Sequence, residues 1–126
     1  MVLGDWGADV IKVERPKTGD DTRTWGPPFV GGESTYYLSC NRSKKRLPLN
    51  LQSETGRSVL KELARRSDVY IENFTPGVAA RLGIDYPTIR EANPRIVYAS
   101  ITGFGPDGPS AQKTGYDIVR SAYGGL

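Results

Sequence analysis

Residues 71–77 decide the fold, and they read Ile-Glu-Asn-Phe-Thr-Pro-Gly. An apolar run ends here, and Pro76 and Gly77 break it where a short helix can begin. An arginine follows at Arg81 and a glycine at Gly83. At the carboxyl ends of strands in α/β proteins, free backbone N–H groups hold anionic ligands. We therefore expect this turn to form an anion-binding corner.

Strand and helix patterns alternate on both sides of the turn. The expected strands are residues 9–14, 46–51, 69–72 and 95–102, and the expected helices are 54–66 (capped by Ser53), 77–82, 87–92 and 116–122. Residues 16–35 are rich in Gly, Pro, Asp and Thr and are expected to form a long loop. Such alternation predicts an α/β fold with a partial, open, mainly parallel sheet and flanking helices. Neither an internal repeat nor a linker between two domains is visible.

Composition limits the kinds of protein that this chain can be. Its 126 residues fit one small domain, and 25% charged with 37% hydrophobic residues is typical of a soluble globular protein. No apolar run reaches the length of a membrane span, and the start lacks the pattern of a signal peptide. The net charge of +3 suits an anionic small molecule but is too weak to indicate nucleic acid. These features predict a soluble, intracellular protein that binds neither nucleic acid nor membrane.

The absence of histidine excludes several kinds of chemistry. With no histidine and only Cys40, the chain cannot form Ser–His or Cys–His pairs, an internal disulfide or a plausible zinc site. Asp20 and Asp21 are adjacent carboxylates without further ligand spacing, so we interpret them as loop and cap residues rather than a metal pair. Cys40 lies beside the apolar residues 36–38 and is expected to be buried.

Three further patterns favour structural over functional interpretations. Residues 103–108 match G-x-G-x-x-G, but their prolines oppose the helix that a dinucleotide site needs, so we expect a tight surface turn. The basic run 42–46 could bind phosphates, although a solvated loop is favoured on composition. Asp117 could be a catalytic carboxylate, but its place at the start of a helix explains it equally well.

Five segments in order resemble the class III CoA-transferases, which include acyl-CoA racemases. They are residues 3–16 (LGDWGADVIKVERP), 19–23 (GDDTR), 36–42 (YYLSCNR), 72–77 (ENFTPG) and 100–105 (SITGFG). Each segment is short, but the ordered set covers essentially the whole chain and is highly specific. Residues 19–28 are most similar to the succinyl-CoA–glutarate branch. The resemblance implies a Rossmann-like part of the family's large domain.

The resemblance also implies which residues contact coenzyme A. These positions suit a ligand with a diphosphate and a 3′-phosphate, which favour arginines and backbone donors. The implied contacts are Arg15 (CoA nucleotide), Leu49 (adenine side), Asn73 and Phe74 (chain against the cofactor), Arg81 (second basic contact) and Tyr116 (thioester end).

Family chemistry depends on a carboxylate and requires neither histidine nor metal. An aspartate attacks an acyl-CoA thioester to form a mixed anhydride, and an enzyme–CoA thioester then passes CoA to the acceptor acid. The resemblance implies acyl-CoA and a carboxylic acceptor as substrates, expected to be dicarboxylates, and an interlocked homodimer. It places the nucleophilic aspartate beyond Leu126, so no catalytic residue is assigned within this chain.

The chain also departs from the family pattern. Only residues 1–3 precede the first matching segment, whereas family members begin with a further strand and helix. We therefore interpret residues 1–126 as part of the large, CoA-binding domain, without its first strand and its catalytic and C-terminal segments. A cytoplasmic location is expected, or the mitochondrial matrix in a eukaryote. Two alternatives are a racemase-branch fragment, disfavoured because that branch carries histidine at the position of Tyr116, and a non-catalytic CoA-binding module.

Overall fold

The computed structural model describes residues 1–113 and 115–125, which belong to two compact units, Met1–Leu51 and Gln52–Leu126. The sequence shows no sign of this division. The boundary is hard to recognise because residues 49–53, which read Leu-Asn-Leu-Gln-Ser, contain neither glycine nor proline. They therefore lack the composition that is typical of a linker. Each unit is described by itself.

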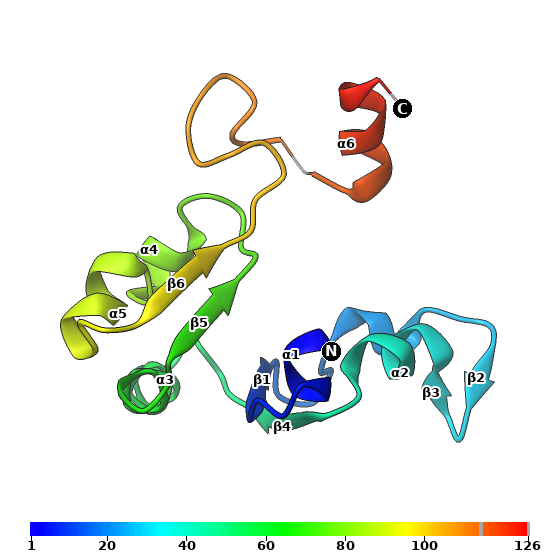
Figure 1. The fold of residues 1–126 in the computed structure, drawn as a ribbon, viewed down its shortest axis with the longest axis horizontal. Coiled ribbons are helices and arrows are strands. Elements are labelled where there is room, and N and C mark those ends of the chain that lie inside the picture. Colours follow the sequence, from blue (N-terminus) through cyan, green and yellow to red (C-terminus); the bar gives the residue numbers. More distant parts are fainter. Residues whose placement is uncertain (114, 126) are drawn as a thin grey trace. The chain divides into compact units, whose positions relative to one another are not determined.

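The first unit is built on a parallel strand pair (Figure 1). Strands β1 (Val10–Glu14) and β4 (Lys44–Pro48) pair in register from Val10 with Lys44 to Glu14 with Pro48. The remaining elements are α1 (Val2–Asp5), the 3-10 helix η1 (Asp21–Thr24), the antiparallel strands β2 (Phe29–Val30) and β3 (Glu33–Ser34), and α2 (Thr35–Asn41).

Several expectations for the first unit were wrong. Residues 16–35 are not one long loop, because Asp20 caps η1 through the N–H of Thr22 and a two-residue hairpin follows. The basic run 42–46 is not wholly a loop, since its last three residues begin β4. This strand also starts and ends earlier than the expected 46–51. Two of the charges in this run have carboxylate partners: Lys45 Nζ lies 2.8 Å from Asp9 Oδ2, and Arg46 Nε lies 2.9 Å from Glu14 Oε2.

Cys40 is exposed rather than buried. Helix α2 turns Tyr37 and Asn41 toward the rest of its unit, with the Asn41 side chain donating to the Tyr37 carbonyl at 3.0 Å. The apolar neighbours that favoured burial, Tyr36 and Leu38, are themselves exposed. An apolar stretch therefore did not identify the packed face of this short helix.

The second unit follows the predicted α/β alternation closely. Its elements are α3 (Glu54–Arg65), β5 (Val69–Glu72), α4 (Val78–Leu82), α5 (Tyr86–Ala92), β6 (Val97–Ser100) and α6 (Asp117–Gly124). Strands β5 and β6 are parallel, from Val69 with Val97 to Glu72 with Ser100. Strand β6 is shorter than the expected 95–102 because its partner, β5, ends at Glu72. The carbonyl of Glu72 accepts the N–H of Ile101 at 2.9 Å, just after the end of β6. Parallel pairs with flanking helices confirm the predicted fold class.

The apolar core lies in the second unit. Within the described ranges, the buried apolar side chains are Leu60, Ala64, Ile84, Ile89, Ile96 and Ala111. The sequence explains α3, because Ser53 accepts the N–H of Gly56 at 3.1 Å as the predicted cap, and Leu60 and Ala64 share one face. That face packs against α5, where Ile89 is fully buried.

Asn93 joins the end of α3 to the approach to β6. Its side-chain amide donates to the carbonyls of Ala64 at 2.9 Å and Ser67 at 2.8 Å, while its oxygen accepts the N–H of Arg95 at 3.1 Å. The last carbonyls of a helix lack partners within the helix. Asn93 therefore closes this end of α3.

Replacing Asn93 with Asp should destabilise the protein by about 1–3 kcal/mol. Aspartate keeps the oxygen that accepts from Arg95 but removes both bonds to the carbonyls. Urea unfolding of the full-length protein measures the change. Thr55→Ala, at an exposed position of α3, should change stability by less than about 0.5 kcal/mol; equal effects of the two variants would contradict this role of Asn93.

Candidate functional site

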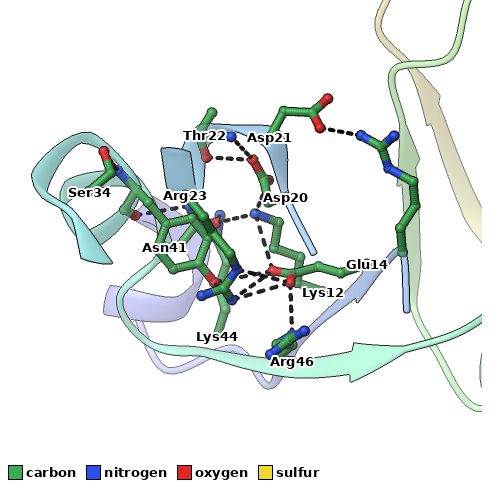
Figure 2. A network of polar contacts seen from close by, with 12 residues as sticks. Lys12, Glu14, Asp20, Asp21, Thr22, Arg23, Ser34, Asn41, Lys44 and Arg46 are labelled. Atoms are coloured by element: carbon green, nitrogen blue, oxygen red, sulfur yellow. Dashed lines mark hydrogen bonds and ion pairs between the residues drawn. The ribbon is translucent and has the colours of Figure 1, made fainter. Parts of the chain in front are cut away.

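A buried carboxylate ends the first strand of the first unit. The side chain of Glu14 is 1% exposed, and three cations surround it: Arg46 Nε at 2.9 Å, Arg23 Nη2 at 3.2 Å and Lys12 Nζ at 3.7 Å. The Tyr37 hydroxyl also donates to it at 3.1 Å. Figure 2 shows Glu14 as the point where these contacts meet. Since a buried charge is costly unless paired, the cations are what permit this glutamate.

A second layer of contacts fixes those cations. Lys12 binds Asp20 and donates to Asn41 Oδ1 at 2.8 Å, and Arg23 pairs with Glu33 at 2.8 Å. Burial favours a higher pKa for Asp20, but hydrogen bonds from Lys12 and Thr22 outweigh it and lower the pKa to about 2. Asp20, which binds Lys12 at the outer side of this network, therefore stays charged at neutral pH.

Arg15 and Leu49 come together at the carboxyl edge of this strand pair. Each directly follows a strand, and the N–H of Leu49 donates to the carbonyl of Glu14 at 3.0 Å. The guanidinium of Arg15 is exposed and pairs with the equally exposed Asp21. The parallel register thus places the first two expected CoA contacts beside one buried glutamate.

Glu72 occupies the same position in the second unit. It is buried at the last residue of β5, and its Oε2 accepts the N–H of Phe74 at 2.7 Å. The N–H of Phe74, within the turn expected to bind an anion, is therefore already bonded to a carboxylate two residues earlier in the chain. Gly77, with φ of 86°, then reverses the chain into α4 in a conformation that favours glycine.

A pocket of about 270 Å³ lies beside this turn and brings three expected contacts together. Asn73, Phe74 and Tyr116 all line it, although Tyr116 is 42 residues after Phe74 in the chain (116 minus 74). Lys113 adds a positive charge to the lining, and its ammonium donates to the Tyr123 hydroxyl at 2.9 Å. Lys113 was not among the site residues expected from the sequence. Its position three residues before Tyr116 could have indicated that it lies at the same pocket.

Close backbone contact places Tyr116 at the pocket. Gly115 lies so near Gly103 that a Cβ on Gly115 would be 2.3 Å from the Gly103 Cα. Only glycine fits at this approach. Residues 103–108 form bends and irregular backbone rather than the expected tight turn, and no helix begins among them. The helix that a dinucleotide site needs is therefore not formed by this segment.

The expected contact Arg81 and the carboxylate Asp117, to which no catalytic role was assigned, remain to be placed. Arg81 is on α4 with an exposed side chain and is not among the residues that line the pocket. Helix α6 begins at Asp117, as expected, while the side chain of Asp117 lies outside the described part of the chain. In residues 1–113 and 115–125, no three His, Cys, Asp or Glu side chains gather as a metal would require. Within the same ranges, no helix has the length and apolarity to cross a membrane.

Comparison with known proteins gives one family. The profile of CoA-transferase family III matches residues 1–126. Human succinyl-CoA:glutarate CoA-transferase is 57% identical over 126 residues, covering 100% of this chain and 29% of the relative. Succinate–glutarate CoA-transferase of Agrobacterium fabrum is 46% identical over 132 residues, covering 100% of this chain and 33% of the relative.

Solved structures agree. A crystal structure of a CaiB/BaiF family protein from Brucella suis superposes with a TM-score of 0.92 at 47% identity, covering 98% of this chain and 34% of that one. Rv3272 of Mycobacterium tuberculosis has a TM-score of 0.89 at 39% identity, covering 98% and 34%. The chain spans about a third of the length of the proteins it matches.

Replacing Glu14 with Gln should destabilise the protein by about 3–5 kcal/mol, because three cations lose the charge that compensates them. Glu33→Gln is the matched control, since Glu33 pairs with the same Arg23 but its side chain is 40% exposed. The control should cost less than about 1 kcal/mol. Urea unfolding of the full-length protein followed by circular dichroism measures both, and similar losses would show that burial of Glu14 is not decisive.

Proposed function

Because the chain belongs to CoA-transferase family III, we propose that it binds CoA thioesters and serves an enzyme that moves CoA between carboxylic acids. The pocket beside the β5 turn carries this proposal. In this unit the family resemblance assigns Asn73, Phe74, Arg81 and Tyr116 to CoA, and all of them except Arg81 line that pocket. The pocket thus joins two assigned segments, residues 73–74 and Tyr116, that are far apart in sequence.

Each unit offers chemistry that suits CoA. In the first unit, Arg15 presents an exposed guanidinium for a phosphate, and Leu49 presents an apolar side chain for the adenine side. In the second unit, Lys113 supplies charge, and Asn73 and Phe74 offer polar and aromatic surface. Arg81 is proposed as a further basic contact on α4.

A phosphate that binds Arg15 must displace Asp21, which pairs with the Arg15 guanidinium. The ion pair is exposed on both sides, 65% for Arg15 and 73% for Asp21. Such a pair is worth at most about 1 kcal/mol in water. A CoA phosphate, with more charge and a geometry that matches the guanidinium fork, can therefore displace Asp21 at little cost.

The names of the relatives guide the substrate class. Two of them act on succinyl-CoA or succinate together with glutarate, and we infer a dicarboxylic donor and acceptor for the full-length enzyme. The transfer would proceed through an aspartyl anhydride and an aspartyl-CoA thioester, and no residue of this chain is assigned as the nucleophile. We also infer an interlocked homodimer, in the cytoplasm or in the mitochondrial matrix of a eukaryote.

Arg15→Gln should weaken CoA binding about tenfold, the loss of one charge-assisted contact. Arg42→Gln is the matched control: Arg42 is also in the first unit, its side chain is 62% exposed and it pairs with a single carboxylate, Asp5. The control should leave the dissociation constant within about twofold, because surface substitutions of this kind rarely propagate. Calorimetric titration of the full-length protein with CoA measures all three dissociation constants.

Two results would count against the proposal. If the unmodified protein does not bind CoA, the proposed function is wrong. If both arginine variants weaken binding equally, general positive charge, and not the position of Arg15, would explain the affinity.

A further inference from the structure

We propose that Glu72 is a positioning residue, whose buried carboxylate sets the conformation of residues 73–77 and with it the wall of the CoA pocket. The inference rests on the proposed function but goes beyond it, because Glu72 itself is not assigned a contact with CoA. It concerns what holds Asn73 and Phe74 in place.

The geometry links Glu72 to the turn by one short bond. Its Oε2 accepts the N–H of Phe74 at 2.7 Å, while its Oε1 lies 3.4 Å from the Tyr98 hydroxyl. A bond from a backbone N–H to a charged oxygen is about twice as strong as a neutral one. The contact with Tyr98 is long, so the bond to Phe74 dominates.

The tyrosine beside Glu72, Tyr98, is fixed by packing against two other aromatic rings. Tyr98 stacks on Tyr70, with centroids 5.1 Å apart, and meets the edge of Tyr86 at 5.6 Å. Burial and the charge of Glu72 raise the pKa of Tyr98 to about 12, so its hydroxyl remains a donor at neutral pH. The carboxylate is thereby directed at the turn and not at solvent.

The turn itself separates two pockets. Phe74, Thr75 and Pro76 line both the 270 Å³ pocket and a neighbouring one of about 330 Å³ that also contains Glu72 and Tyr98. A change in the turn therefore alters the wall of the CoA pocket from its far side. Glu72 lines only the second pocket, which is why it acts through the turn.

A stabilising role alone does not explain a charge at this position. No ion pair to Glu72 occurs in the described part of the chain. Burying a charge without an ionic partner costs free energy, so an apolar side chain of similar volume removes that cost and offsets the lost bond to Phe74. Glu72 should therefore matter more for the turn than for global stability.

The test compares Glu72→Met with Ile89→Val in the full-length protein. Glu72→Met should raise the dissociation constant for CoA about five- to tenfold and speed amide exchange at Phe74 about tenfold, with the melting temperature nearly unchanged. Ile89→Val, in the fully buried core of the same unit, should lower the melting temperature and leave CoA binding within about twofold. Calorimetry, hydrogen exchange by mass spectrometry and thermal melting provide the three readouts.

Glu72→Gln supplies a graded result and replaces Glu72→Met if that variant does not fold. It keeps an acceptor for the Phe74 N–H but without charge, so both effects should be intermediate, about two- to threefold. Unchanged exchange at Phe74 in the folded Glu72 variants, or a loss of CoA affinity no greater than in Ile89→Val, would overturn the inference. If the unmodified protein fails to bind CoA, the proposed function fails, and the exchange rates alone still decide whether Glu72 holds the turn.

Discussion

A buried glutamate ends the first strand of each parallel pair, and the candidate contacts depend on it. Glu14 ends β1 and Glu72 ends β5, and each directly precedes an expected contact, Arg15 or Asn73. A carboxylate cannot be buried unless its oxygens are satisfied. Both glutamates therefore impose order on the segment that follows, which is where a parallel pair presents its ligand-binding edge.

The two units satisfy that constraint differently. In the first, three cations and a tyrosine surround Glu14. Within the described residues of that unit, no apolar side chain is buried. In the second, Leu60, Ile84 and Ile89 form an apolar core, and the glutamate contacts a backbone N–H and a tyrosine hydroxyl. The first unit should be more sensitive to charge, and the second to packing.

Sequence analysis succeeded where local signals decide structure. The cap at Ser53, the apolar run 69–72 and the break at Gly77 gave α3, β5 and the following helix nearly to the residue. It missed the Glu14 network because Arg46 reaches Glu14 only through the pairing of β4 with β1. From sequence alone, a strand of basic residues is easily predicted as a loop, because the carboxylates that pair with it lie elsewhere in the chain. Cys40 was misplaced for a related reason, since tertiary contacts chose the packed face of α2.

A crystal structure of the full-length protein with CoA would test the central claim most directly. We expect CoA against Asn73 and Phe74 in the pocket beside the β5 turn. Glu14 should keep its bonds to Arg23 and Arg46, and Glu72 its bond to the N–H of Phe74, neither carboxylate touching the ligand. CoA phosphates bound to Arg23 or Arg46, with Glu14 released, would contradict the account.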